Sequence, residues 1–369
     1  MKVLIVGGGI VGLSTAWALA RRGHTPVVYD QGAVPNPMAA SYDQHRIIRL
    51  AYGERDGYCR MVKPAFQAWR RLWHDLGEQH YVETGTLLIG SDADDYATLS
   101  RASFDRLSIP YDELDKAAVE GLCPFLRLGG NAWGLYNTEG GVLLADRIVN
   151  ALAAWLRSQG TEIYPLTTVR GADFHNAIIA LSDDTQHEAD ALVVAAGAWT
   201  PQLVPDLTSI VEPKRQVVVY LEPRTRDLEA WRNSPVIVDF GGTNETWAIP
   251  PVANTGLKLG AGVHRRGGDP SAPRTLEANE ATQVLTYFQS HLRNLERYRI
   301  VEGRVCYYGC SNDERFVVNT TKRAVAITGC SGHMFKFGAL FGLELAEFLT
   351  GAGDADAFVR WMQGKAMDG

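Results

Sequence analysis

Three glycines near the amino terminus, Gly7, Gly9 and Gly12, have the Gly-x-Gly-x-x-Gly spacing that holds a dinucleotide pyrophosphate. The first glycine makes a tight turn, the second lets the backbone approach the pyrophosphate, and the third packs a helix on a strand. The helix amino terminus offers N–H groups to the anion. Asp30 ends the next strand, TPVVYD, and would accept hydrogen bonds from the adenosine ribose. The pattern predicts a dinucleotide without separating NAD from FAD, and a glycine turn without a cofactor is the alternative.

A second group with reactive potential is Cys306, four residues before Cys310 in the segment GRVCYYGC. A free cysteine is most often a small buried hydrophobic residue, and this is the simplest interpretation of Cys306. A zinc site could also be formed by Cys306, Cys310, Cys330 and His333, but the spacing of the first two cysteines is not Cys-x-x-Cys. We therefore expect no metal site.

Four basic residues stand beside apolar ones. Arg46 and Arg49 enclose two isoleucines, which argues for a buried segment, although arginine is usually exposed. Lys258 alternates with leucines in GLKLG, where an exposed edge-strand lysine is the ordinary case. Lys336 lies between two phenylalanines near the start of an apolar helix and opposes its dipole. A nearby anion would explain this lysine, and extension to water along the aromatics is the alternative.

The elements that must position these residues follow from hydrophobic periodicity. Residues 2–6 form a short β-branched strand and residues 10–22 an amphipathic helix. Helices are predicted over 63–76 and 146–159, with Gly77 and Gly160 as their ends. The segment ALVVAAGAWT is a buried strand that enters a glycine turn, so the nucleotide domain resumes at 191 after an interruption. Alternating patterns from about 216 indicate a mostly antiparallel sheet, and 324–351 returns as strand, glycine loop and helix.

Composition limits the partners. The 369 residues carry a net charge of −6, so neither nucleic acid nor a membrane is expected as a partner. Five irregularly spaced cysteines do not make a disulfide framework, which favours the cytoplasm. The amino-terminal apolar run resembles a secretory signal, but three consecutive glycines interrupt it. No apolar stretch is long enough to span a bilayer.

The chain resembles the monomeric sarcosine oxidase type of FAD-dependent amine oxidases, within the glycine and D-amino-acid oxidase fold. Six pieces in the same order carry this resemblance, namely GGGIVG, HRIIRLAYGE, VVAAGAW, GLKLG, VCYY with DERFVV, and CSGHMFKFG. It implies an α/β fold in which a Rossmann-like FAD domain accompanies a mostly antiparallel-sheet substrate domain. The FAD domain is expected at 1–82, 143–215 and 317–369, and the substrate domain at 83–142 and 216–316.

The resemblance also implies roles for single residues. Cys306 would tether the flavin through a thioether, and Arg46 would lie against the ring. Arg49 and Lys336 would hold the substrate carboxylate, Lys258 would promote the reaction with oxygen, and Tyr308 would line the substrate pocket unless it is a core aromatic. Further cofactor contacts are expected from Gly197, Trp199, Gly332 and Lys336.

Departures from the family pattern bear on the substrate. The family has a histidine near the flavin where this chain has Tyr42, which puts the tether in doubt, and Tyr-His where this chain has Ala261 and Gly262. The pocket is therefore expected to be larger. His45, His264, Arg265 and Arg266 add cationic groups, and they suggest a substrate with a second carboxylate such as iminodiacetate.

The predicted function is oxidation of a secondary amine, an N-substituted glycine such as sarcosine or iminodiacetate. Hydride would pass to FAD, water would hydrolyse the imine, and oxygen would become hydrogen peroxide. The partners are the amine and oxygen, and the protein is expected to be a monomer or a small homo-oligomer. A dehydrogenase with another electron acceptor, a nicotinamide enzyme and a non-catalytic FAD-binding protein are the alternatives.

Overall fold

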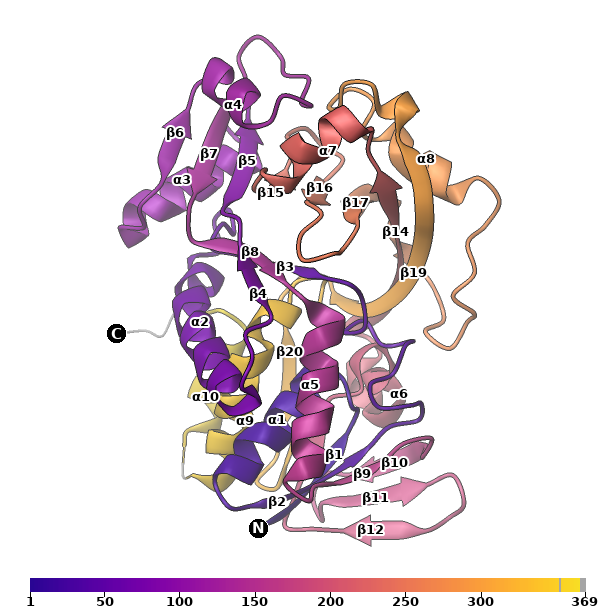
Figure 1. The fold of residues 1–369 in the computed structure, drawn as a ribbon. Coiled ribbons are helices and arrows are strands. Elements are labelled where there is room, and N and C mark those ends of the chain that lie inside the picture. Colours follow the sequence, from indigo (N-terminus) through magenta and orange to yellow (C-terminus); the bar gives the residue numbers. More distant parts are fainter. Residues whose placement is uncertain (352, 366–369) are drawn as a thin grey trace.

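The computed structural model describes residues 1–351 and 353–365, and its centre is a six-stranded sheet (Figure 1). The sheet is parallel apart from one edge strand, and its order is β20 (Val317–Thr320), β21 (Ala324–Thr328), β13 (Ala191–Val194), β1 (Lys2–Val6), β2 (Thr25–Tyr29) and β9 (Glu162–Tyr164). Strand β1 is covered on both faces, because Val3 and Ile5 pack into one core and Leu4 and Val6 into another. Burial on both faces explains its continuous apolar sequence.

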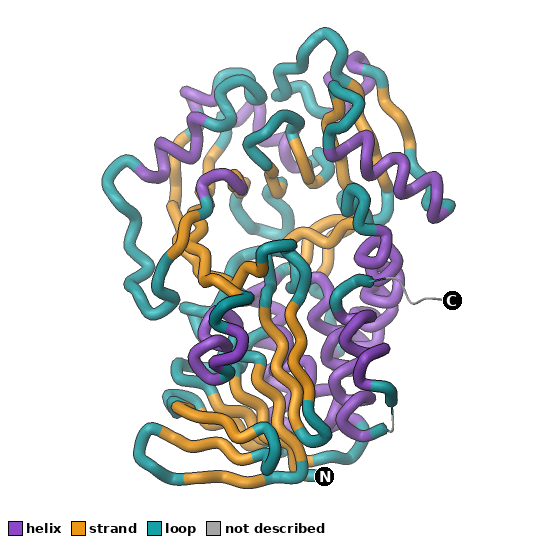
Figure 2. Tube along the Cα trace, turned by 180° about the vertical axis from the view of Figure 1, so that it is seen from behind, coloured by secondary structure: helices purple, strands orange, loops and turns teal. Residues whose placement is uncertain are grey.

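Helices cover one face of this sheet and a small antiparallel sheet covers the other. The helices are α1 (Ile10–Arg21), α2 (Asp56–Leu76), α5 (Ala145–Ser158), α9 (Gly338–Thr350) and α10 (Ala355–Met362). The small sheet contains β10 (Val169–Asp173), β11 (Ile178–Leu181) and β12 (Gln186–Glu188). Seen from behind, the strands of this half of the molecule lie to one side of the helices (Figure 2). The predicted return of the chain to this layer after residue 191, and again after 324, is therefore observed.

A nine-stranded sheet forms the other half of the molecule. Its strands are β18 (Arg266–Gly267), β14 (Val211–Glu222), β17 (Leu257–Ala261), β16 (Thr246–Ile249), β15 (Val236–Asp239), β5 (Thr86–Gly90), β7 (Trp133–Asn137) and β6 (Asp112–Leu114), with β19 (Arg299–Ser311) paired to β14. All pairs are antiparallel except β15 with β5. The predicted mostly antiparallel sheet is confirmed.

Short elements complete the described part of the chain. A three-stranded sheet of β3 (Arg46–Arg49), β8 (Gly140–Leu143) and β4 (Tyr81–Glu83) lies between the two large sheets (Figure 1). The remaining helices are α3 (Tyr96–Leu107), α4 (Lys116–Leu122), α6 (Thr200–Leu203), α7 (Thr225–Arg232) and α8 (Glu280–Thr286). 3₁₀ turns occur at Gly197–Trp199, Pro205–Leu207, Gly262–His264, Leu295–Arg297 and Phe335–Phe337.

One helix differs from its predicted bounds. Helix α2 was expected to start at residue 63, beside Pro64, but it begins at Asp56. Its first turns are apolar on one side, with Tyr58, Met61 and Val62 buried, so tertiary packing extends the helix past the proline. It ends as expected at Gly77, which has a left-handed φ of 74°. No helix in the described residues is long and apolar enough to cross a membrane. The limits of the two domains stay a prediction.

Candidate active site

A cavity of about 790 Å³ runs from the carboxyl ends of β1 and β2 to the nine-stranded sheet. It lies near the upper end of the range for ligand pockets, which is about 300–1,000 Å³. Twelve of the predicted site residues line it, namely Gly7, Gly9, Asp30, Arg46, Arg49, Gly197, Trp199, Lys258, Cys306, Tyr308, Gly332 and Lys336. The two predicted residues outside the lining are Gly12 and His45.

The glycine turn has the shape that the pyrophosphate of a dinucleotide requires. Gly7 has a φ of 109°, and a Cβ there would lie 2.4 Å from the carbonyl oxygen of Ala195. A Cβ on Gly12 would lie 1.9 Å from the carbonyl oxygen of Gly7, so the helix can pack here only with glycine. Gly9 and the first turn of α1 line the cavity. These residues fit a bound dinucleotide, and Gly12 acts through packing, as its place in the motif predicts.

Asp30 lies at the end of β2 with its carboxylate fixed by protein donors. Its Oδ2 accepts a hydrogen bond from the Gly8 N–H at 2.8 Å, and its Oδ1 accepts from the Gly32 N–H and the Asn36 side chain. Asn36 also lines the cavity, but in the sequence it is marked only by a proline-rich loop. The bond from Asp30 to the ribose stays a prediction.

Lys258 is buried, with 1% of its surface exposed, and lines the cavity. The interpretation as an exposed edge-strand lysine is wrong, because β17 lies between β14 and β16. The ammonium donates to the Asp43 carboxylate and to the carbonyl oxygen of His45. Burial and the neighbouring Arg46 lower the pKa of Lys258 to about 8, although Asp43 opposes this shift.

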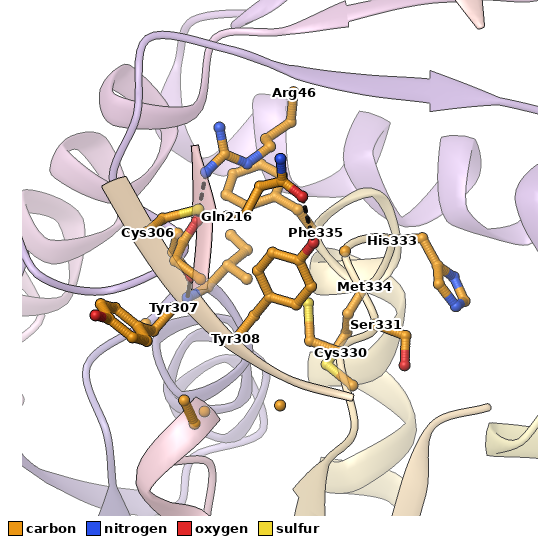
Figure 3. Close-up of a pocket in the computed structure, with 18 of the residues that line it drawn as sticks. Arg46, Gln216, Cys306, Tyr307, Tyr308, Cys330, Ser331, His333, Met334 and Phe335 are labelled. Carbon is orange, nitrogen blue, oxygen red and sulfur yellow. Dashed lines mark hydrogen bonds between the residues drawn. The ribbon is translucent and has the colours of Figure 1, made fainter. Parts of the chain in front are cut away.

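Arg46 lies in the same group of side chains. Its guanidinium donates to the Asp43 carboxylate and to the carbonyl oxygens of His45 and Ala40. It also extends toward Cys306 along the cavity wall, as Figure 3 shows. The alternative of a solvated surface arginine is therefore wrong for Arg46. Asp43, which gathers these cations, was missed, because nothing in a loop sequence shows that an acid meets a lysine more than 200 residues away.

Arg49 and Lys336 meet at Tyr52. The Lys336 ammonium donates to the Tyr52 hydroxyl at 3.0 Å, and the Arg49 guanidinium lies 4.5 Å from the centre of the Tyr52 ring. Arg49 also donates to the Tyr96 hydroxyl at 2.7 Å. Burial, and next the charge of Arg49, hold the pKa of Lys336 well below its usual value.

These two cations have no carboxylate of their own. Among the ion pairs of the described residues, none involves Arg49 or Lys336. Lys336 is 4% exposed, so the interpretation as a lysine that extends to water is wrong. The half-buried Arg49 and the buried Lys336 share a cavity wall and form a site for an anion, whose charge would favour the protonated form of Lys336. A substrate carboxylate fits the planar fork of Arg49.

Cys306 and Tyr308 lie on the same stretch of β19. The Tyr308 hydroxyl donates to the Gln216 side chain at 3.3 Å, and Figure 3 shows this bond beside Cys306. Gln216 is the residue of β14 paired with Cys306. Burial raises the pKa of the Cys306 thiol, while the neighbouring Arg46 opposes the shift. Gln216 was missed, since an isolated glutamine in a strand carries no motif. In the part of the chain that the structure describes, no three His, Cys, Asp or Glu side chains form a metal site.

The predicted tether has a direct test. If the predicted thioether forms, acid precipitation of the wild-type protein will leave the yellow colour in the pellet, because Cys306 would hold the flavin. Cys306→Ser is expected to release the colour to the supernatant, with Cys330→Ser, the neighbouring thiol in Figure 3, as the matched control. Release from both the wild type and the control would show that Cys306 makes no covalent bond. The departure at Tyr42 would then be the first place to search for the reason.

The turns around residues 197 and 332 also contact the cavity. Gly197 and Gly332 have φ values of 57° and 79°, which glycine adopts without strain. Trp199 lines the cavity, and its indole N–H donates to the Ser271 hydroxyl at 3.0 Å. Contact of these residues with the cofactor stays a prediction.

Several residues expected to add positive charge do not. His45 is fully buried behind Lys258, and burial together with Lys258 lowers its pKa to about 3, so the ring is neutral. His264 and Arg266 pair with Glu280 outside the cavity lining. These positions correct the expectation of a strongly cationic pocket.

The same region bears on the expected enlargement of the pocket, which stays a prediction. Arg265 lines the cavity, but it pairs with Glu245 at 2.7 Å and Glu314 at 3.1 Å. The space beside Gly262 is filled, because a Cβ there would lie 1.9 Å from the Glu245 carboxylate. Ala261 packs into the core of the nine-stranded sheet instead of the cavity.

Asp239, at the end of β15, is an acid in the cavity wall that the sequence did not reveal. It is 9% exposed, and the Gly241 N–H donates to one of its oxygens at 3.1 Å. Burial raises the pKa of Asp239 to about 6, and the nearby charge of Arg49 opposes this. The cavity therefore has a carboxyl group close to the predicted carboxylate holder.

Known proteins share both the sequence and the architecture. Residues 2–348 match the family described as "FAD dependent oxidoreductase". The chain is 25% identical to the N-methyl-L-tryptophan oxidases of Yersinia pestis and Yersinia pseudotuberculosis, over 94% of this chain and 94% of theirs.

Solved structures have the same fold. NikD, an unusual amino acid oxidase, superposes with a TM-score of 0.80 at 20% identity, covering 96% of this chain and 94% of NikD. A modified fructosyl peptide oxidase from Aspergillus nidulans gives 0.81 at 22% identity, covering 100% and 94%.

The chain thus belongs to the FAD-dependent oxidoreductases. Its sheets and glycine turn give it the sarcosine oxidase-like form of that fold. The predicted family, fold class, FAD cofactor and enzyme class are confirmed.

Proposed function

We propose that the protein is an FAD-dependent oxidase of N-substituted amino acids that acts on the CH–NH bond of a secondary amine. One observation carries the proposal. The half-buried Arg49 and the buried Lys336 have no acidic partner among the described ion pairs, and both lie on the wall of the cavity that contains the glycine turn. An anionic substrate group that binds both cations would be held beside the redox cofactor.

The chain's own groups would position the substrate. Arg49 would bind the carboxylate with its planar fork while Lys336 supplies a second charge. The charges of Asp239 and Arg49 lie near enough to affect each other's pKa. The site therefore suits a zwitterion whose carboxylate binds Arg49 and whose amine lies toward Asp239. The pKa of Asp239, about 6, would allow this carboxylate to take the ammonium proton near neutral pH. Tyr52, Tyr96 and Tyr308 would enclose the bound molecule.

When bound, FAD would accept hydride from the substrate carbon and pass two electrons to oxygen, which gives hydrogen peroxide. Loss of hydride from a neutral secondary amine leaves a protonated imine, and water converts it to a smaller amine and a carbonyl compound. Lys258 would supply the fixed positive charge that favours the reaction with oxygen. The cytoplasmic location and a monomer or small homo-oligomer remain part of the proposal.

The substrate is proposed as an N-methyl amino acid or another N-substituted glycine. The relatives named as N-methyl-L-tryptophan oxidases support an N-methyl group. Arg265 and Arg55 are the cations that remain in the lining for a second carboxylate, and glutamates already pair with both. Iminodiacetate, unlike sarcosine, would therefore have to compete with these glutamates for a cation that binds its second carboxylate.

A peroxide-coupled assay tests this proposal. The panel contains sarcosine, other N-methyl amino acids, iminodiacetate, and for each N-methyl amino acid the matched amine that lacks the carboxylate. Turnover is expected with the carboxylates and is expected to fall sharply with the matched amines. Equal turnover of the two sets would contradict the anion site. Flavin bleaching without peroxide would indicate a dehydrogenase with another acceptor.

A further inference from the structure

We propose that Asp43 positions Lys258 and Arg46 at the flavin end of the cavity and keeps the Lys258 ammonium charged for the reaction with oxygen. The inference rests on the proposed function, because it assigns Lys258 to the oxidative half-reaction. It adds a positioning residue that none of the predicted motifs included.

Asp43 is the meeting point of three cations and a phenol. One carboxylate oxygen, Oδ2, accepts hydrogen bonds from the Lys258 ammonium and the Arg46 guanidinium. The other, Oδ1, accepts from the Tyr220 hydroxyl at 2.5 Å and lies 3.4 Å from the Arg304 guanidinium. Asp43 is 3% exposed, so little water competes for these contacts.

Two further hydrogen bonds fix the side chain and the backbone of Asp43. The Gln44 N–H donates to Oδ1 at 2.9 Å, and the Asp43 carbonyl accepts from the Asp146 N–H at the start of α5. The four partners come from β3, β14, β17 and β19, so this one side chain joins the nine-stranded sheet to the sheet of β3. A single carboxylate therefore determines where the two flavin-facing cations lie.

The charges explain why the acid is needed. Lys258 and Arg46 carry like charges in a buried place, and each disfavours the charge of the other. Burial also opposes the charge of Asp43, but Lys258, Arg46 and Arg304 outweigh it and hold the pKa of Asp43 well below its usual range. Asp43 is then ionised at every pH at which the enzyme would work, and its negative charge supports the ammonium.

Other groups around Lys258 do not replace this charge. The titratable and charged groups that face the ammonium come from β3, the preceding loop, β14 and β19, and they are Asp43, His45, Arg46, Tyr220 and Cys306. His45 is neutral, and burial raises the pKa values of both Tyr220 and the Cys306 thiol, which keeps both groups protonated. In this group Asp43 is the one anion.

The test compares Asp43→Asn with Tyr220→Phe, which removes one hydrogen bond from Asp43 without changing its charge. The rate at which oxygen restores the oxidised colour is measured across pH. In the wild type the rate should fall as pH rises through about 8, the pKa of Lys258. In Asp43→Asn the midpoint should move down by about 1 to 3 pH units. The rate at pH 8 should then drop at least about five-fold, while Tyr220→Phe keeps the wild-type midpoint.

A second readout does not depend on turnover. The visible band of the oxidised flavin, recorded without substrate across pH, should titrate with the charge beside the ring and show the same downward shift in Asp43→Asn. Asp43→Glu, which restores the charge, should return the midpoint toward the wild type. Asp43→Ser serves as the neutral variant if Asp43→Asn does not fold.

The outcomes separate the role of Asp43 from the assignment of Lys258 to the reaction with oxygen. An unchanged midpoint in the neutral variant, or a faster reaction with oxygen at all pH values, would overturn the role of Asp43. If Lys258→Met leaves the reaction with oxygen unchanged, the assignment of Lys258 is wrong. A spectral midpoint that still depends on Asp43 would in that case keep the electrostatic link between the two side chains.

Discussion

Arg49→Met is expected to lower kcat/KM for an N-methyl amino acid by about 30-fold to several thousand-fold, because loss of one partner of a buried charge pair costs about 2–5 kcal/mol. Arg49 is the planar fork of the anion site, and methionine keeps much of its apolar length without the charge. Most of the loss should appear as weaker substrate binding, measured by anaerobic titration of the flavin band. The kcat/KM of Arg49→Lys should lie between those of the wild type and Arg49→Met, since an ammonium cannot bind two oxygens in one plane.

Arg55→Met is the matched control for this experiment. Arg55 also lines the cavity, but Glu314 already pairs with it at 3.4 Å. Its replacement should change kcat/KM only a few-fold, as expected for a partly exposed ion pair of about 0–1 kcal/mol. Similar losses in the two variants would mean that Arg49 has no special place in substrate binding, and the proposed anion site would have to be abandoned.

Lys258→Met is expected to slow the reaction with oxygen by about 10²- to 10³-fold, the usual effect of removing one preorganised electrostatic group. The positive charge stabilises superoxide as it forms, and methionine fills the space without it. The step in which substrate bleaches the flavin should change far less, because Arg49 and Lys336 remain. Rapid mixing of the reduced protein with oxygen, and separately of the oxidised protein with substrate, measures the two steps.

The control for this second variant is Lys214→Met. Lys214 lies on β14, the strand beside β17, but away from Tyr220, the residue paired with Lys258. It is more exposed and pairs with Glu212. It should leave both steps unchanged. An equal loss of both steps in Lys258→Met would indicate a general structural fault, and no loss in the oxygen step would exclude Lys258 from it.

The sequence was informative where chemistry is local. Three features lie within the first thirty residues, namely the turn of Gly7 and Gly9, the helix directly after it and the acid Asp30. The structure places them together at the cavity. The RIIR, GLKLG and CSGHMFKFG segments gave the cations that line the cavity. The glycine motif depends on neighbours in the chain, which is why periodicity and motif could find it. The cations were singled out by the resemblance, whereas the strand pattern alone favoured an exposed Lys258.

The missed residues depend on tertiary contact. Asp43 and Gln216 meet their partners only after separate sheets pack together, so no local pattern marks them. Asp239 lies in the region predicted as a mostly antiparallel sheet, but periodicity cannot show that the last residue of β15 opens on a cavity. The opposite error concerns His264 and Arg266, whose positive charge was counted without the glutamates that pair with them.

The most direct test of the central claim is anaerobic mixing of the yellow protein with an N-methyl amino acid, followed by air. The account predicts that the visible flavin band is bleached by the N-methyl amino acid. It should not be bleached by the matched amine without a carboxylate. Air should then restore the band with release of hydrogen peroxide. A band that no N-substituted amino acid bleaches, in protein shown to be folded and loaded with FAD, would contradict an oxidase of secondary amino acids.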